Sequence, residues 1–360
     1  MPPGSGAPSA DCFFMSAADS IVCPPVDVII PHYRAIDQLE RCLQSLRRTS
    51  YPSMTIIVVD NGGGDPALRQ LISRYPGARL LSLSENRGYS GGCNAGFRAS
   101  TADFVVFMND DTQHDSRWLA ELVTAAERDP RVAALQPKIL SLQAYEKGRK
   151  VFDYAGGAGG MLDRLGYPWC YGRSFFGVEE DRGQYDTPRN IFWASGAAML
   201  VRRTSFEEVG GFDDSFFMHM EEIDLCWRLL LAGYRIRSVP SSVVWHEGGA
   251  SLACGAPEKI YCNHRNNLAM LARNLGIASL VPVLSVRLLL EPAAAFFYLM
   301  KGRNGPAGFA AVFRALRDFF IGLPRTIRSR SQTQGLRKLP DGAIFRNQPL
   351  SLFFARPNAP

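Results

Sequence analysis

The fold is constrained most strongly by a regular alternation of apolar runs and amphipathic segments between residues 26 and 108. Four runs have the length and composition of buried strands, and the segments between them place apolar residues at helical spacing. The predicted strands are 26–30, 55–60, 79–83 and 104–108, and the predicted helices are 37–46, 66–75 and 92–99. This alternation predicts an α/β fold in which helices cover both faces of a parallel sheet.

The remainder of the chain is less regular. Helices are predicted at 117–128, 221–232 and 257–275, and extended segments at 132–140, 197–201 and 234–245. Residues 141–190 carry many glycines and aromatic residues without a clear period, which indicates loops and short strands. Residues 1–24 are rich in small residues and proline and lack a basic leader, so we expect a disordered segment and not a signal peptide.

The segment 276–330 combines two kinds of pattern. Residues 277–300 are apolar enough to span a bilayer, but Arg287, Glu291 and two prolines argue against a simple transmembrane helix. Residues 309–330 place four apolar side chains among arginines, which is typical of a basic amphipathic helix on a membrane surface. These apolar residues are Phe313, Leu316, Phe319 and Phe320. The alternative is that both helices pack on the body of the protein. We therefore predict a main domain at 25–275, membrane-associating helices at 276–330 and a tail at 331–360.

Charge and cysteine content limit the partners. The formal net charge is +6, and from Lys301 onward 11 Lys and Arg stand against 2 acids, so the preceding 300 residues carry about −3. A basic C-terminal region suggests an anionic surface as partner. We find neither a nucleic-acid-binding motif nor a basic stripe with interleaved aromatics in the body, so nucleic acid is not expected. The eight cysteines form no C-x-x-C pair and read as reduced thiols of a cytosolic protein.

Two adjacent carboxylates, Asp110 and Asp111, follow the fourth predicted strand directly. Ligands of open α/β sheets bind outside the carboxyl ends of the strands, where these acids would lie. Carboxylates at such an edge can hold Mg²⁺ or Mn²⁺, which usually carries substrate phosphates. The alternative is a polar loop that opens the next helix, with Thr112 or Asp115 as its cap.

Two features nearer the N-terminus point to the same edge. Asp60 ends the second strand and could accept from the N–H of a pyrimidine base, or cap the turn formed by residues 62–64. Residues 85–94 form a glycine-rich turn entering a helix, where the backbone and Arg87 could approach a diphosphate. The turn is not G-x-G-x-x-G, so a dinucleotide-binding fold is a poor match.

Two further features lie beyond residue 210. Glu221, Glu222 and Asp224 stand at the start of a predicted helix, where the helix dipole alone favours acids. One of them could instead be a general base toward a hydroxyl. His246 ends an extended run before two glycines. It is either structural or a further ligand beside the acidic pair.

The order and spacing of these features resemble family 2 glycosyltransferases of the GT-A fold, especially the rhamnosyltransferase-like enzymes of bacterial cell-envelope polysaccharide assembly. The resemblance covers roughly residues 26–275. It is carried by Val28-Ile29-Ile30-Pro31-His32-Tyr33, Val58-Val59-Asp60-Asn61, Glu85-Asn86-Arg87-Gly88-Tyr89, Asn109-Asp110-Asp111-Thr112, Ser195-Gly196-Ala197, Gly210-Gly211-Phe212-Asp213, Glu221-Glu222-Ile223-Asp224 and His246. It implies a Rossmann-like nucleotide-binding sheet flanked by helices.

The resemblance also implies roles for single residues. Glu222 would be the catalytic base, although this position more often reads Glu-Asp, which leaves Glu221 and Asp224 as alternatives. Asp111 would bind a divalent metal, Mg²⁺ or Mn²⁺, with His246 as a possible further ligand. Asp110 would face the ribose or donor sugar. The remaining donor-site residues would be Pro31, His32, Tyr33, Asp60, Asn86, Arg87 and Gly196.

The reaction implied by the resemblance is inverting transfer of one sugar from a nucleotide-diphosphate sugar to a hydroxyl. The donor would be dTDP- or UDP-linked, possibly dTDP-rhamnose, and the acceptor lipid-linked or polysaccharide. The Q-x-x-R-W sequence of processive members is absent, which favours single-sugar transfer. We expect a cytoplasmic enzyme, peripheral on the inner face of the bacterial plasma membrane. The alternatives are a catalytically inactive sugar- or lipid-binding module and a sugar-phosphate nucleotidyltransferase, which would need an N-terminal glycine-rich loop carrying Arg and Lys.

Overall fold

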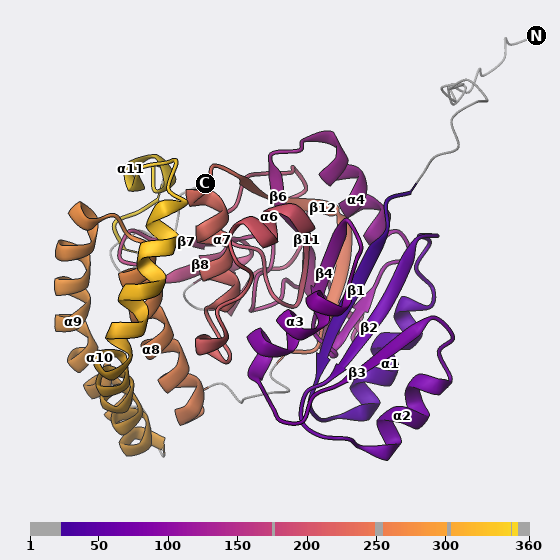
Figure 1. Cartoon of the computed structure of the whole chain (residues 1–360), viewed down its shortest axis with the longest axis horizontal. Coiled ribbons are helices and arrows are strands. Elements are labelled where there is room, and N and C mark those ends of the chain that lie inside the picture. The colour runs from indigo at the N-terminus through magenta and orange to yellow at the C-terminus, as the bar shows by residue number, and fades with distance from the viewer. Residues whose placement is uncertain (1–22, 175–176, 249–254, 301–303, 347, 352–360) are drawn as a thin grey trace, which may run out of the picture.

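The structure is a computed structural model that describes residues 23–174, 177–248, 255–300, 304–346 and 348–351 (Figure 1). Nearly all of the N-terminal segment predicted to be disordered, and the last nine residues of the predicted tail, lie outside the described residues.

One eight-stranded sheet forms the centre of the molecule, in the order β3-β2-β1-β4-β11-β6-β12-β5. The predicted parallel arrangement is confirmed for its first half, where β1 pairs in parallel with both β2 and β4, and β2 with β3. In the second half β11 runs antiparallel between β4 and β6, so the whole sheet is mixed. The strands are β1 (Val26–His32), β2 (Met54–Asp60), β3 (Ala78–Ser82), β4 (Phe104–Met108), β5 (Thr112–His114), β6 (Val132–Ser141), β11 (Ala198–Arg202) and β12 (Arg235–His246).

Helices cover both faces of the sheet, as predicted. Side chains alternate along β1, so that Val28 and Ile30 join one buried cluster and Ile29 the other. The first cluster is covered by α1 (Ile36–Leu46), α2 (Pro66–Ser73) and α4 (Trp118–Arg128), and the second by α3 (Gly88–Ala99), α6 (Arg203–Glu208) and α7 (Glu221–Leu231). Strands buried on both sides explain the continuous apolar runs in the sequence.

Short elements fill the less regular regions, as predicted for residues 141–190. They are α5 (Leu142–Tyr145), β7 (Gly160–Leu162), β8 (Pro168–Cys170), β9 (Arg173–Ser174), β10 (Gly177–Val178), the 3₁₀ turn η1 (Asp214–Phe216) and, near the C-terminus, α11 (Asp341–Ile344).

Three long helices form the flank at the left of Figure 1: α8 (Pro257–Asn274), α9 (Ile277–Leu299) and α10 (Gly305–Gly335). By length and composition α9 could cross a membrane. Its charged side chains Arg287 and Glu291 are only 1% exposed, however, and pair with each other at 2.8 Å inside the protein. Arg287 also donates to the backbone oxygen of Leu165 at 2.9 Å. Arg287 therefore ties α9 to the body of the protein.

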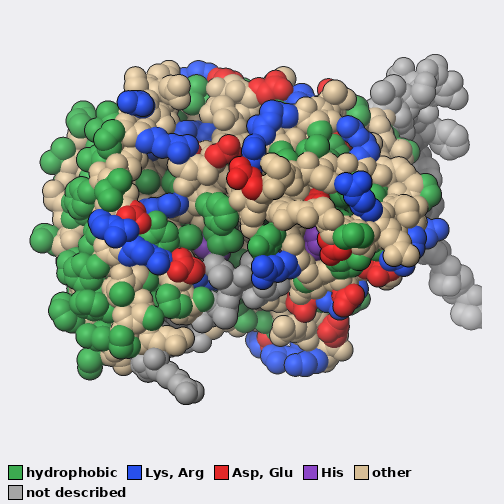
Figure 2. Space-filling model, turned by 60° about the horizontal axis from the view of Figure 1, so that its bottom comes forward, with side chains coloured by type: hydrophobic (Ala, Val, Ile, Leu, Met, Phe, Trp, Pro, Cys, Tyr) green, Lys and Arg blue, Asp and Glu red, His purple; other side chains and the backbone are tan. Residues whose placement is uncertain are grey.

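The outer side of these helices is apolar. Hydrophobic side chains gather over the left flank in Figure 2, and the exposed ones on α9 include Leu289 and Phe296. On α10, Phe313 and Phe320 are exposed, but Phe319 is buried against Leu268 and its neighbours on α8. The prediction that Phe319 faces a membrane is therefore wrong, since a helix that packs on one side turns part of its apolar stripe inward.

Candidate active site

The predicted site residues come together where strands β1, β4 and β12 end. His32 closes β1, and its Nδ1 atom lies 2.6 Å from Oδ2 of Asp110, just beyond β4. Burial raises the pKa of Asp110 above its usual value, although His32 acts in the opposite direction. Pro31 is partly buried beside His32, whereas the Tyr33 ring is exposed and lies under the guanidinium of Arg34. Asp110 is thus turned toward β1.

Asp111 is turned the other way, toward the end of β12. Its Oδ1 atom lies 3.1 Å from Nε2 of His246, and both side chains are buried. The opposite ring nitrogen of His246, Nδ1, lies 3.1 Å from Oδ1 of Asp153. Burial acts to lower the pKa of His246, but these two carboxylates raise it well above its usual value. Burial likewise opposes ionisation of Asp111, but His246 holds the pKa of this carboxyl below its usual value.

Asp153 is a site residue that the sequence did not single out. It lies in the loop region after β6, and its Oδ1 atom also accepts from the backbone N–H of Ala155 at 2.8 Å. Since residues 141–190 have no clear period, nothing in the sequence placed this carboxylate beside a histidine 93 positions away.

The side chains of Asp111 and His246 are suitable ligands for a divalent cation whose remaining ligands come from a substrate. No group of three or more His, Cys, Asp and Glu side chains in the described part of the chain forms a ready-made metal site. Yet Asp111 Oδ1 is buried and, apart from its ion-pair contact with His246, has no hydrogen-bond partner among the described residues. The neighbouring His246 nitrogen adds a second donor atom. Mg²⁺ and Mn²⁺ commonly take only one or two protein ligands and complete their shell with water and phosphate oxygens.

Asp60 and Asn61, at the end of β2, form hydrogen bonds with two different turns. The backbone N–H groups of Gly63 and Gly64 donate to the two carboxylate oxygens of Asp60, at 3.1 and 2.7 Å. This is the capping arrangement considered for Asp60, and it leaves the side chain buried at the end of β2. Next to it, Asn61 accepts from Arg87 N–H at 2.9 Å and donates to the Gly88 carbonyl at 2.8 Å. Asn61 was not predicted, and it fixes the turn to the strand.

Within the turn, Asn86 and Arg87 have different surroundings. The side chain of Asn86 accepts from Gly88 N–H at 2.8 Å and so shapes the start of α3, which begins four residues earlier than the predicted helix. Arg87 is about half exposed, and its only ion pair among the described residues is a long one of 3.6 Å to Glu85. Its guanidinium is therefore available to an anionic ligand.

Gly196 lies beside the ring of Tyr89 at the start of α3. The Tyr89 hydroxyl donates to the Gly196 carbonyl at 2.7 Å, and a Cβ on Gly196 would meet that hydroxyl at 3.0 Å. Burial raises the pKa of Tyr89 well above its usual value, and the nearby carboxylates Glu221 and Glu222 raise it further. Tyr89 therefore connects the glycine-rich turn, Gly196 and the acids of α7.

The three acids at the start of α7 have separate environments. Asp224 is fully buried and engaged on both oxygens, by Arg228 at 2.8 Å and by Asn274 at 2.7 Å, which is a structural role. By contrast, one oxygen each of Glu221 and Glu222 is buried without a hydrogen-bond partner among the described residues. Burial raises the pKa of Glu222 to about 7, and burial together with Glu222 raises that of Glu221 well above its usual value.

His219, two residues earlier, adds a third buried polar atom. Its Nε2 has no partner among the described residues, and burial together with Lys259 lowers its pKa to about 4. Buried polar groups without partners are rare in folded proteins, so a cluster of three within four residues marks the place of a ligand. An ionisable pair with a carboxyl pKa near neutrality is suited to general base chemistry.

Comparison with known proteins shows the family of this chain. Residues 27–210 match the glycosyl transferase family 2 domain, and the chain belongs to this family. It is 32% identical over 258 residues to the N-acetylglucosaminyl-diphospho-decaprenol L-rhamnosyltransferase of Mycobacterium tuberculosis, an alignment that covers 68% of this chain and 83% of the relative. It is 27% identical over 226 residues to rhamnosyltransferase WbbL of Escherichia coli, covering 60% of this chain and 81% of that relative.

The fold comparison agrees with the family. The crystal structure of GalNAc-T7 with UDP, GalNAc and Mn²⁺ superposes with a TM-score of 0.57, at 14% identity, over 86% of this chain and 58% of that one. The chain is thus a GT-A glycosyltransferase with rhamnosyltransferase relatives, and the predicted family, fold and enzyme class are confirmed. The sugar-phosphate nucleotidyltransferase alternative is wrong.

Proposed function

We propose that the protein transfers a single sugar, with inversion, from a nucleotide-diphosphate sugar to a hydroxyl of a lipid-linked acceptor, in a reaction that depends on Mg²⁺ or Mn²⁺. The observation that carries this proposal is the pair of carboxylates at the start of α7, Glu221 and Glu222, each of which has one buried oxygen without a hydrogen-bond partner among the described residues. They lie near Tyr89, whose hydroxyl donates to Gly196, and two residues after Gly196 the chain pairs with the end of β4, just before Asp110 and Asp111.

The donor would lie across the carboxyl ends of β1, β2 and β4. Asp60 and the segment Pro31 to Tyr33 would surround the base, and Asp110 would face the ribose or the sugar. The N-terminus of α3, with Asn86 and Arg87, is suited to the diphosphate, because the positive end of the helix dipole and a half-exposed guanidinium favour anions.

Asp111 and His246 would hold the cation. A divalent cation bound there would neutralise negative charge on the departing nucleoside diphosphate. The protein's own part is to present a carboxylate oxygen and an imidazole nitrogen 3.1 Å apart, with Asp153 fixing the imidazole from behind.

Glu222 would act as the base. Two adjacent buried carboxylates do not both ionise readily, so Glu221 keeps its proton while Glu222, with a pKa of about 7, exchanges its own near neutral pH. Ionised Glu222 removes the proton from the acceptor hydroxyl as its oxygen attacks the anomeric carbon from the face opposite the diphosphate. Gly196 and Tyr89 would border the donor sugar and exclude water.

The relatives support a more specific substrate pair. The M. tuberculosis relative is an L-rhamnosyltransferase that acts on N-acetylglucosaminyl-diphospho-decaprenol. By analogy, the donor here would be a pyrimidine nucleotide of a deoxyhexose such as dTDP-rhamnose, and the acceptor a sugar linked through a diphosphate to a long polyprenol.

Such an acceptor lies in a membrane, and the outer side of α9 and α10 is suited to reach it. Exposed apolar residues such as Leu289 and Ile321 lie on these helices. Arg325 and Arg328 are also exposed on α10. Apolar insertion together with attraction of arginines to anionic lipid would hold the enzyme on the cytoplasmic surface of the membrane, with α9 lying along it.

The test is a panel of nucleotide sugars measured by thermal shift with and without Mn²⁺, followed by turnover with the best donor and a polyprenyl-diphosphate sugar. Because a ligand of the native state raises its stability by mass action, we expect a rise in Tm for one pyrimidine nucleotide sugar, larger with Mn²⁺. Stabilisation by nucleotide sugars without any turnover would support the inactive sugar-binding alternative instead.

A further inference from the structure

The loop that leads into α7 is strained. Three of the four non-glycine residues with positive φ in the described part of the chain lie in it, namely Phe217 (φ 60), His219 (φ 67) and Met220 (φ 74). Left-handed backbone at residues with side chains costs about 1–3 kcal/mol each and persists only where the surroundings enforce it. The strained run ends directly at Glu221 and Glu222, so the path of this loop decides where both carboxylates lie.

Two neighbouring side chains of α8 hold the loop. Asn266 is fully buried, and its side-chain amide donates to the carbonyls of Phe216, Met218 and His219, at 2.9, 2.8 and 2.8 Å. Arg265 donates to the carbonyls of Ser215 and Phe216 at 2.8 and 3.2 Å. Arg265 also donates from Nε to the Asn266 oxygen at 2.8 Å, which fixes the orientation of the amide. Four loop carbonyls therefore converge on one pair of residues.

The opposite side of the loop rests on the donor-site helix. A Cβ on Gly88, which has φ +67, would lie 2.2 Å from the Phe217 carbonyl oxygen, so only glycine permits this approach. Ser90 N–H donates to the same oxygen at 3.4 Å. The loop is thus clamped between the start of α3 and the middle of α8.

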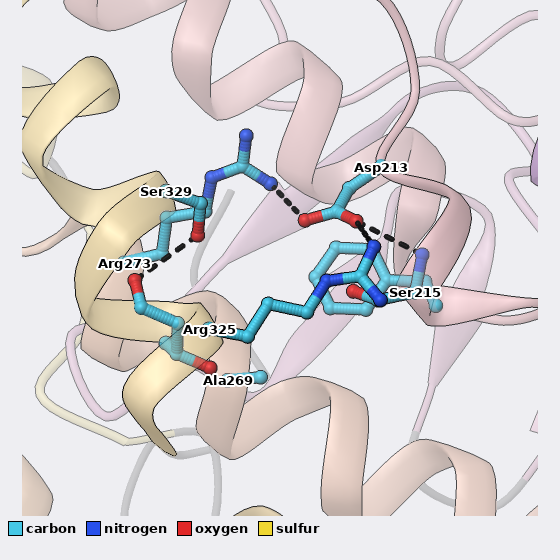
Figure 3. Close-up of a pocket in the computed structure, with 8 residues that line it drawn as sticks. Asp213, Ser215, Ala269, Arg273, Arg325 and Ser329 are labelled. Carbon is cyan, nitrogen blue, oxygen red and sulfur yellow. Dashed lines mark hydrogen bonds and ion pairs between the residues drawn. The ribbon is translucent and has the colours of Figure 1, made fainter. Parts of the chain in front are cut away.

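The beginning of the loop is fixed by ion pairs to α8 and α10. Figure 3 shows Asp213 between Arg273 of α8, at 2.7 Å, and Arg325 of α10, at 3.6 Å. Asp213 also accepts from Ser215 N–H at 2.9 Å. The route from Asp213 to Glu222 is therefore set by side chains of α8 and α10, which lie far along the sequence from the donor-binding half of the chain.

We propose that Arg265 and Asn266 are positioning residues, which hold the strained 217–220 loop so that Glu222 faces the acceptor hydroxyl. The inference rests on the proposed role of Glu222 as base. Among the described residues, no hydrogen bond or ion pair joins either residue to the donor-binding elements, so they act on the chemical step through the loop and not on donor binding. Because proton transfer needs near-attack geometry, a displacement of about 1 Å can cost on the order of 10²-fold in rate.

The test compares Asn266→Ala and Arg265→Gln with the wild-type protein. Arg330→Gln is the matched control, because Arg330 donates to the carbonyls of Ala272 in α8 and of Leu275 directly after it, but to no carbonyl of the loop among the described residues. Three quantities are measured: kcat with its pH dependence, the donor dissociation constant, and hydrogen exchange of residues 215–221. If Asn266→Ala does not fold, Arg265→Gln decides, because Arg265 is only partly buried.

We expect both loop variants to lose about tenfold or more in kcat, with an unchanged donor dissociation constant and faster exchange in the loop. The pKa read from the kcat profile should fall, because a loosened loop admits water to Glu222. A folded loop variant with the kcat of the wild type would overturn the proposal. So would a loop variant that loses activity only as Arg330→Gln does, with an unchanged pH profile of kcat. Hydrogen exchange does not depend on turnover, so the two proposals can fail separately. An inactive wild-type protein would count against the proposed function, whereas unchanged hydrogen exchange of the loop in the variants would count against the positioning role.

Discussion

Oδ1 of Asp153 lies 3.1 Å from Nδ1 of His246, while Nε2 of the same imidazole lies 3.1 Å from Oδ1 of Asp111. A carboxylate behind a histidine fixes the ring orientation and keeps the proton on the nitrogen away from the metal. Once His246 gives up its second proton, Nε2 carries a free electron pair between Asp111 Oδ1, at 3.1 Å, and the side-chain amide nitrogen of Asn109, at 3.2 Å. The pair therefore joins an irregular loop to the end of a strand in one functional unit.

We predict that Asp153→Asn weakens Mn²⁺ binding by about 10- to 100-fold, because the amide does not hold the imidazole in the same protonation state. Binding can be followed by the electron paramagnetic resonance signal of free Mn²⁺. Asp181→Asn is the control, since Asp181 is a similarly buried carboxylate that pairs with Lys138 at 2.8 Å and not with a histidine. Equal Mn²⁺ affinity in the two variants would refute this role for Asp153.

Asp111→Asn should weaken both Mn²⁺ binding and the metal-dependent part of donor binding, because it removes the anionic ligand nearest the diphosphate. Isothermal titration of the donor, with and without Mn²⁺, measures both effects. Asp110→Asn is the matched change one residue away. Since Asp110 contacts His32 and not His246, this variant should keep its affinity for Mn²⁺. If Asp111→Asn keeps the metal-dependent turnover of the wild type, Asp111 is not a ligand of the metal.

Stability should depend on pH through Glu222. Its pKa is about 7 in the folded protein against an ordinary value of 4.5, so the folded state binds the proton more tightly than the unfolded state. This contribution to stability is fully present below pH 4.5 and is lost as the pH rises through about 7. Glu222→Gln should therefore be more stable than the wild type at pH 8, by on the order of 2 kcal/mol, with little difference at pH 4.

Urea denaturation of both proteins at the two pH values checks this prediction. A difference in unfolding free energy that is the same at pH 4 and pH 8 would mean that Glu222 titrates normally in the folded protein.

Membrane attachment should depend on the outer side of α9. Leu289→Glu combined with Phe296→Glu should lower binding to anionic vesicles, because both side chains are more than half exposed and would no longer enter the bilayer. Point changes are preferable to deletion, since α10 packs on α8 and its removal would uncover Leu268 and Ala272. Val178→Glu places the same charge on another exposed apolar residue and is the control. If the double variant and Val178→Glu bind vesicles equally well, the outer side of α9 does not attach the protein to the membrane, and α9 and α10 have a purely structural role.

Much of the donor half could be predicted because its functional residues end apolar strands. Asp60, Asp111 and His246 each follow such a run, and the ends of neighbouring strands meet at one edge of a sheet. The direction of a strand is not written in its composition, so the antiparallel insertion of β11 was not foreseen. The helix 309–330 had the right period, but periodicity does not tell whether Phe319 or Phe320 turns inward.

Residues that act through long-range contacts left no local signal. Asp153 stands in an aperiodic region, and Asn266 reads as an ordinary polar residue of a helix although it is fully buried. Each is recognisable only once the fold brings it to a partner, His246 in one case and the carbonyls before α7 in the other.

The identity of the catalytic base is tested most directly by single-turnover sugar transfer together with donor binding in Glu222→Gln, Glu221→Gln and Asp224→Asn. Glu222→Gln should bind the donor as the wild type does, yet transfer sugar about 10²- to 10⁴-fold more slowly, as is usual when a general base is removed. Glu221→Gln should keep much of the rate, and Asp224→Asn should act mainly on stability, since Asp224 pairs with Arg228 and Asn274. Near-normal transfer by Glu222→Gln, with loss of transfer in Glu221→Gln alone, would contradict the assignment and place the base one residue earlier.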